Sequence, residues 1–172
     1  GDDQNKIADE IIEAWKEADL ILTTGGVSVG EKDFLPGVIE NLTGNVLFHG
    51  IQVKPGMPTM LSVVNGTPVL SLSGNPFAVE ALFEVLAGGY LTDMEASRYL
   101  QKNQMKILKQ TFVKTGKMKR IVKGRCDESG VYLPQIQKNG QLKNGIGSNC
   151  LVIFPEGERT YTEGEAVWVI RI

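Results

Sequence analysis

The first part of the chain alternates a helical pattern with short apolar runs. From Ile7 to Trp15, apolar residues recur at three- and four-residue spacing over a charged face, and Asp2 and Asp3 precede them as capping residues. This pattern predicts an amphipathic helix of about three turns. The next run, residues 18–24, has β-branched members and no alternation, which predicts a strand buried on both faces.

Helices and strands continue to alternate up to about residue 91. The pattern predicts a second helix that Asp33 caps and that accepts Pro36 in its first turn. The strands expected next occupy residues 46–53, 59–64 and 68–72. Asn65-Gly66 predicts a hairpin turn between the last two, and a third helix is expected over residues 77–91. Strands separated by helices predict an α/β fold with a largely parallel sheet, to which the hairpin adds one antiparallel pair.

Beyond about residue 100 the pattern changes to short β-type runs separated by Gly and Asn. The runs expected to be strands are residues 105–113, 118–122, 130–133, 150–154 and 166–172. Several short strands without intervening helices predict a small all-β barrel or sandwich. We therefore predict two domains, an α/β domain over residues 1–97 and a β domain over residues 98–172. Because the first helix of a doubly wound sheet normally follows a strand, we also expect the first domain to begin before Gly1.

Charge follows the same division. The chain has 172 residues, 42% hydrophobic and 22% charged, as in ordinary soluble globular proteins. Its formal net charge of -2 is small because the opposite net charges of its two halves cancel. Residues 1–97 carry 4 Lys/Arg against 14 Asp/Glu, a net charge of -10, whereas residues 98–172 carry 14 Lys/Arg against 6 Asp/Glu, a net charge of +8. Such a split indicates two bodies with different surfaces.

Several classes of protein are excluded by composition. No apolar run approaches the ~20 residues that a membrane-spanning helix requires, and the polar, acidic start is the reverse of a secretory signal. Cys126 and Cys150 form no CxxC motif, and His49 is the single histidine, which excludes Cys-rich and multi-His metal sites. We expect a cytoplasmic protein with no membrane partner, in which His49 packs in a strand and has no functional role.

The loop from residue 23 to residue 33 is the first candidate for chemistry. It leaves a predicted strand and enters a helix, where open α/β sheets bind ligands. Gly25, Gly26 and Gly30 allow backbone N–H groups to approach an anion, Ser28 adds a hydroxyl, and the helix N-terminus favours phosphate. Asp33 is placed to hold a divalent cation or to orient a nucleophile. The alternative is a simple strand-to-helix turn that Asp33 caps.

Two further loops also follow predicted strands. Residues 54–58 place Lys54 beside a glycine that two prolines flank, which makes either a stiff anion-binding loop or a rigid connector with a solvated lysine. Residues 73–76 lead into a helix that Asn75 can cap, with Pro76 in its first turn. Because all three loops lie at the ends of elements of one domain, we expect them to converge on one crevice at the carboxyl edge of its sheet.

These loops resemble those of the molybdopterin molybdenumtransferases, or molybdenum insertases, the MoeA family that includes the gephyrin E domain. The matching segments are residues 24–33, Lys54-Pro55-Gly56-x-Pro58 and Leu72-x-Gly74-Asn75-Pro76. The second half also resembles the family's C-terminal barrel at residues 137–142, 148–149, 154–157 and 164–167. The resemblance therefore covers nearly the whole chain.

The resemblance implies a three-layer α/β molybdopterin-binding domain, truncated at its N-terminus, followed by a small β-barrel. It implies a transferase that takes adenylylated molybdopterin and molybdate, inserts the metal and releases AMP with the help of Mg²⁺. Asp33 is then the catalytic acidic residue and the ligand of the metal, and Lys54 attracts molybdate. The residues that the resemblance places at the substrate are Gly25, Gly26, Ser28, Gly30, Lys54, Pro55, Gly56, Pro58, Gly74, Asn75 and Pro76.

The sequence departs from the family in three loop residues and in length. Many relatives have a second lysine at Met57, a proline at Ser73 and a serine near Ala78, and the family is about twice as long, with further N-terminal domains. The family forms homodimers whose active site includes an N-terminal domain of the partner, so the isolated chain is expected not to turn over unaided. The alternative is a non-catalytic pterin-binding or scaffold module of the same fold. Tungstate in place of molybdate stays open.

The second half also carries a basic cluster, consisting of Lys114, Lys117, Lys119, Arg120, Lys123 and Arg125. Such a cluster in a β-rich module fits nucleic-acid binding, but stacking platforms for single strands need aromatic residues, which are sparse here. A solvated face or a contact with the acidic half is the favoured interpretation, and nucleic-acid binding the less favoured one. Phe112 and Trp168 are expected in the core.

Overall fold

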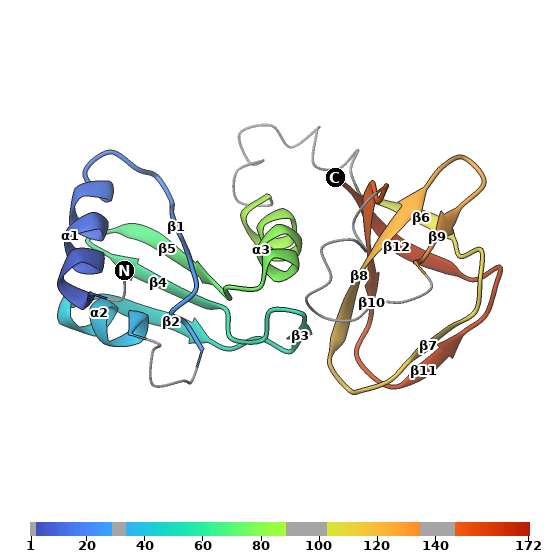
Figure 1. The fold of residues 1–172 in the computed structure, drawn as a ribbon, viewed down its shortest axis with the longest axis horizontal. Coiled ribbons are helices and arrows are strands. Elements are labelled where there is room, and N and C mark those ends of the chain that lie inside the picture. The colour runs from blue at the N-terminus through green and yellow to red at the C-terminus, as the bar shows by residue number, and fades with distance from the viewer. Residues whose placement is uncertain (1–2, 29–33, 89–102, 135–146) are drawn as a thin grey trace. The chain divides into compact units, whose positions relative to one another are not determined.

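The computed structural model describes residues 3–28, 34–88, 103–134 and 147–172. The chain folds into two compact units, the first holding residues 1–51 and 56–79 and the second residues 52–55 and 80–172 (Figure 1). The predicted order, an α/β body followed by an all-β body, is confirmed. The predicted boundary near residue 98 lies outside the described residues.

The first unit is built on a four-stranded sheet. Its strands are β1 (Ile21–Thr24), β2 (Asn45–His49), β4 (Met60–Val64) and β5 (Thr67–Leu72), in the spatial order β1-β5-β4-β2. The hairpin turn is confirmed, since Asn65 and Gly66 have φ of 49° and 84°, the conformation of a type I′ turn. This turn reverses β4 against β5, and β2 pairs antiparallel with β4.

The sheet corrects two predictions. A largely parallel sheet is wrong as a description of the pairings, because β1 with β5 is the one parallel pair among its strands in the described residues. The strand predicted over residues 18–24 is shorter and is not buried on both faces. As β1, it lies at an edge of the sheet with Leu22 41% exposed, because one of its sides has no neighbouring strand within the described residues.

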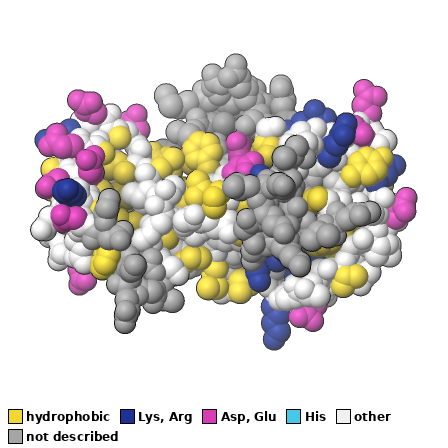
Figure 2. Space-filling view, viewed as in Figure 1, with side chains coloured by type: hydrophobic (Ala, Val, Ile, Leu, Met, Phe, Trp, Pro, Cys, Tyr) yellow, Lys and Arg dark blue, Asp and Glu magenta, His cyan; other side chains and the backbone are white. Residues whose placement is uncertain are grey.

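Two helices, α1 (Gln4–Ala14) and α2 (Leu35–Asn41), cover one face of this sheet. Asp3 caps α1 as predicted, its carboxylate accepting hydrogen bonds from the N–H groups of Asn5 and Lys6. The core between helices and sheet contains Ile11, Ile21, Val27, Leu35, Val38, Ile39, Met60, Val64 and Val69. Acidic side chains gather over α1 and the turn after it, where Asp9, Glu10, Glu13 and Glu17 are exposed (Figure 2).

The predicted cap of the second helix, Asp33, lies outside the described residues. The N-cap position of α2 is Phe34, whose side chain makes no capping hydrogen bond. Pro36 lies in the first turn as predicted. The third predicted helix begins at Pro76 as α3 (Pro76–Leu82) and continues as a π-helical turn, η1 (Phe83–Ala87).

Apart from residues 80–87, which belong to α3 and η1, the second unit is a set of antiparallel strands joined by one parallel pair. The strands are β3 (Val53–Lys54), β6 (Asn103–Ile107), β7 (Phe112–Lys114), β8 (Lys119–Cys126), β9 (Val131–Tyr132), β10 (Cys150–Phe154), β11 (Arg159–Tyr161) and β12 (Ala166–Arg171). Their order is β3-β8-β10-β12-β6 with β9 beside β8, and β7 pairs with β11. A bridge from Leu108 to Val131 of β9 returns the pairing to β8, as expected of a small barrel.

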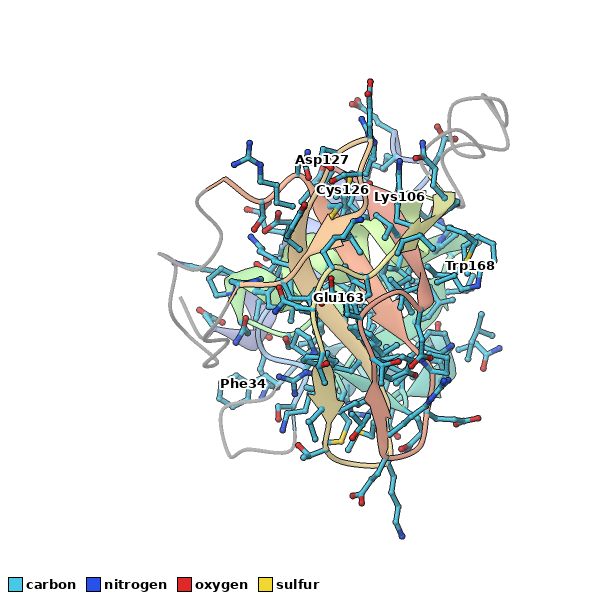
Figure 3. All side chains as sticks on the ribbon, turned by 90° about the vertical axis from the view of Figure 1, so that its right-hand side faces the viewer. Phe34, Lys106, Cys126, Asp127, Glu163 and Trp168 are labelled. Atoms are coloured by element: carbon cyan, nitrogen blue, oxygen red, sulfur yellow. The ribbon has the colours of Figure 1, made fainter. Side chains whose placement is uncertain are left out.

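Aromatic rings fill the core of the second unit. Phe154 is fully buried, with ring centroids 4.5 Å from Phe112 and 4.7 Å from Tyr161. Trp168 corrects the prediction that it belongs to the core: it points outward from β12 and is 55% exposed, because its neighbours Val167 and Val169 take the inward positions (Figure 3). In the described parts of the chain, no helix is long and apolar enough to cross a bilayer.

Candidate functional site

The candidate site lies at one edge of the sheet in the first unit. Thr24 ends β1 beside Leu72 at the end of β5, so the loops after these two strands leave the sheet together. The start of β4 and the end of β2 lie at the same edge, because Met60 pairs with both Ser71 and His49. This edge is therefore the meeting place of the loops that follow β1 and β5 and the loop that precedes β4.

The loop after β1 is held against the loop after β5. Gly25 and Gly26 have φ of 84° and 66°, a left-handed conformation that favours glycine. The Gly25 N–H donates to the carbonyl oxygen of Leu72 at 2.9 Å, and a Cβ added to Gly74 would lie 3.6 Å from the Gly25 Cα. The structure thus brings Gly25 and Gly74 together, as the sequence predicted for their loops.

The remainder of the first loop is anchored from both sides. The Gly26 carbonyl oxygen accepts a hydrogen bond from the Leu35 N–H at 3.1 Å, and Val27 is 1% exposed in the core under α2. Ser28 is exposed. The loop is therefore anchored at Gly26 and Val27, and the next residue, Ser28, faces solvent.

Asn75 and Pro76 shape the third loop as predicted. The Asn75 side-chain oxygen accepts hydrogen bonds from the N–H groups of Phe77 and Ala78 at 3.0 and 3.1 Å. Pro76 is the first residue of α3. Asn75 therefore ends the loop by capping the helix, and this cap leaves Gly74 as the residue that approaches the first loop.

The second loop divides between the two units. Gly56 and Pro58 belong to the first unit, where the hydroxyl of Thr59 donates to the Gly56 carbonyl oxygen at 2.7 Å and stiffens the turn into β4. Lys54 and Pro55 belong to the second unit, because β3 pairs with β8. The convergence of Lys54 with the glycine loops stays a prediction.

Three comparisons place this geometry among known proteins. A family profile described as a probable molybdopterin binding domain matches residues 1–93, more than half of the chain. The molybdopterin molybdenumtransferase of Bacillus subtilis (strain 168) is 31% identical over 183 residues, and that of Staphylococcus aureus (strain COL) is 29% identical over 174 residues. The chain belongs to the MoeA family of molybdopterin molybdenumtransferases.

Solved structures agree with this membership. The molybdopterin biosynthesis MoeA protein of Pyrococcus horikosii superposes with a TM-score of 0.79 at 26% identity, over 98% of this chain and 41% of that one. The two curated relatives align over 97% and 98% of this chain, which spans 42% of their length. The family's members are named for the biosynthesis of the molybdenum cofactor.

Two predicted site residues of this MoeA-family chain, Gly30 and Asp33, lie outside the described residues. Within the residues that are described, no three His, Cys, Asp or Glu side chains gather as a metal site. The roles of Gly30 and Asp33, including Asp33 as a ligand of Mg²⁺, stay predictions.

Two buried hydroxyls lie one residue before the ends of β1 and β5, next to the site. The sequence pattern did not indicate them. Thr23 and Ser71 are register partners on β1 and β5, and neither side-chain oxygen has a hydrogen-bond partner among the residues that the structure describes. Ser71 is fully buried. Buried polar atoms without partners are costly and rare in folded proteins, so two of them side by side mark this edge as a place where a ligand or water is expected.

Lys54 also has a neighbour that sequence spacing did not reveal. In the parallel pair of β3 and β8, Lys54 stands opposite Arg120 and Val53 opposite Lys119. Partners across a pair of strands project to the same side, so Lys54 and Arg120 place two cations together. No local pattern links residues so far apart in the chain, and the pairing of strands alone shows it.

The remaining chemical candidates have structural roles. Cys126 and Cys150 are buried, and burial raises the pKa of the Cys150 thiol to about 12, which excludes it as a nucleophile at neutral pH. In the basic cluster, Lys114 is 2% exposed and its amino group donates to the carbonyl oxygens of Gly116 and Gly157. Lys123 pairs with Glu80 at 2.5 Å, within the second unit. A contact of this cluster with the first unit stays a prediction.

Proposed function

We propose that this chain carries part of an active site that inserts molybdate into adenylylated molybdopterin with release of AMP. Water cleaves the diphosphate of the substrate, which gives AMP and molybdopterin. The two dithiol sulfurs of the pterin then bind the metal, and their two protons leave with one oxo group of molybdate as water. Both substrates are anions, and the proposal needs groups that bind anions in a unit whose sequence is acidic.

The pair of unpartnered hydroxyls is the observation that carries the proposal. Thr23 and Ser71 lie one residue before the ends of β1 and β5, next to the loop with two left-handed glycines, and a buried hydroxyl can donate to a phosphate through a bound water. Glycine at 25 and 26 keeps the backbone of this loop free of side chains. We therefore place the diphosphate and pterin at Gly25, Gly26, Ser28 and Gly74.

Lys54 and Arg120 are proposed to bind molybdate together. Many relatives have a second lysine where this chain has Met57, and Met57 is exposed here with no charge to offer. Arg120 supplies a second cation from β8, and its planar fork suits an oxyanion.

Replacing either Lys54 or Arg120 with alanine is therefore expected to weaken molybdate binding about tenfold, because each removes one charge-assisted hydrogen bond. Titration calorimetry of the complete gene product with molybdate, and then with tungstate, measures this. Lys106→Ala is the matched control, since Lys106 is a lysine of the same unit whose amino group bonds the Asp127 carbonyl oxygen. Equal affinities for the control and for both variants would contradict the role of the pair.

The overall proposal is tested by AMP release. When molybdate is added to the complete gene product loaded with adenylylated molybdopterin and Mg²⁺, AMP is expected to appear in solution. We propose Asp33 as the ligand of Mg²⁺, which would neutralise the charge of the diphosphate. Asp33→Asn is thus expected to slow AMP release strongly, while Asp9→Asn, on the exposed face of α1, leaves it unchanged.

The alternative is a module that binds the pterin without catalysis. It is supported by Met57, which stands where many relatives have a second lysine. Such a protein binds the adenylylated pterin and never releases AMP, an outcome that overturns the proposed activity while leaving the pterin site intact. The homodimer and the cytoplasmic location expected from the resemblance stay predictions.

A further inference from the structure

His49 makes a contact that its place in the sequence does not suggest. β1 and β2 lie at opposite ends of the strand order β1-β5-β4-β2, yet the loop after β1 reaches the end of β2. The His49 Nε2 atom lies 2.8 Å from the carbonyl oxygen of Val27. Because a carbonyl oxygen only accepts, Nε2 carries the hydrogen and donates it.

The imidazole is held by a fixed backbone. His49 is in register with Met60 of β4, and the next residue, Gly50, donates its N–H to the Thr59 carbonyl oxygen at 2.8 Å. The acceptor side is equally constrained, because Val27 is 1% exposed in the core. A donor on a paired strand and an acceptor on a buried residue define one orientation for the peptide that joins Val27 to Ser28.

The orientation of that peptide decides where the next N–H group points. In a planar trans peptide, the carbonyl oxygen of Val27 and the N–H of Ser28 point in opposite directions. With the oxygen aimed at His49, the Ser28 N–H is aimed away from it. Ser28 is exposed, and its N–H donates to no acceptor within the described residues.

We propose that His49 is a positioning residue that keeps the Ser28 N–H turned away from β2 and available as a donor to the bound anion. The inference rests on the anion site proposed above at Gly25, Gly26 and Ser28. Without the His49 donor, the peptide can rotate and present the Val27 carbonyl oxygen in place of the N–H, and this oxygen repels an anion. His49 thus acts on the ligand through the backbone and does not touch it.

The test uses the 172-residue chain labelled with ¹⁵N and inorganic pyrophosphate as the probe. In the wild type, the Ser28 amide resonance is expected to move as pyrophosphate is added, and its titration gives the Kd. His49→Phe keeps a planar ring but removes the donor, so it is expected to weaken binding about 5- to 10-fold and to suppress the Ser28 shift. His49→Gln restores a side-chain N–H donor and is expected to recover most of both. Asn45→Ala, at the exposed opposite end of β2, serves as the matched control and should behave as the wild type.

The outcomes separate this inference from the function on which it rests. If the wild-type Ser28 amide does not respond to pyrophosphate, the anion site itself is overturned. If it responds equally in the wild type and in His49→Phe, with equal Kd, the anion site stands and the role of His49 is overturned. A His49→Gln variant that folds with dispersed amide resonances but fails to recover binding would also count against an orienting hydrogen bond.

Discussion

Replacing Phe154 with alanine is expected to lower the free energy of unfolding of the second unit by about 3–5 kcal/mol. Phe154 is fully buried on β10, where its ring stacks on Phe112 at a centroid distance of 4.5 Å and meets the tilted ring of Tyr161 at 4.7 Å. Removing its ring takes away buried apolar surface and leaves a cavity. The flanking rings come from β7 and β11, which pair with each other, so the cavity lies where several strands meet and cannot collapse easily.

The measurement is urea unfolding followed by Trp168 fluorescence, in a Trp15→Phe background so that Trp168 of β12 is the one tryptophan that reports. Val113→Ala is the control. Val113 lies next to Phe112 on β7 but is 62% exposed, so its truncation should change the free energy by no more than about 0.5 kcal/mol. Similar losses for the two variants would show that the aromatic cluster does not stabilise this unit.

Replacing Gly130 with alanine is expected to destabilise the same unit by about 3 kcal/mol or more. Gly130 has φ of 149°, and an added Cβ would lie 2.3 Å from the Ile107 carbonyl oxygen and 2.8 Å from the Lys109 Cε atom. The lysine end can move away, but the carbonyl oxygen belongs to the backbone. It is held there because the bridge from Leu108 to Val131 brings the end of β6 against the turn that contains Gly130.

Gly116→Ala separates the two costs of the Gly130 substitution, which are the positive φ and the steric clash with the Ile107 carbonyl oxygen. Gly116 also has a positive φ, 91°, but an added Cβ meets nothing within 4 Å. It is therefore expected to lose only about 1 kcal/mol, the cost of the left-handed conformation. The same urea series measures both variants. If Gly130→Ala proves as mild as Gly116→Ala, the close approach of Ile107 is not a constraint on the folded state.

Predictions that depended on neighbouring residues were the ones that succeeded. The caps at Asp3 and Asn75 and the turn at Asn65-Gly66 involve groups two or three positions apart, so the side chain and the local backbone decide them. The start of α2 depends on a more distant contact. Phe34 is its N-cap, and Leu35, its first residue, joins the core and donates its N–H to the Gly26 carbonyl oxygen.

The sequence itself determined the loops and their order along the chain, the hairpin, the helix caps at Asp3 and Asn75, and the division into an α/β part and a β part. Each of these depends on residues close together in the chain. Three features were decided by the tertiary structure alone: β1 at the edge of its sheet, Arg120 beside Lys54, and His49 bonded to Val27. The first two arise from the pairing of strands that lie far apart in sequence, and the third from a loop that reaches the end of a strand with which β1 does not pair. Contacts of this kind are selected by the packing of an entire face of a sheet. They leave no hydrophobic periodicity in the sequence around the residues that they bring together.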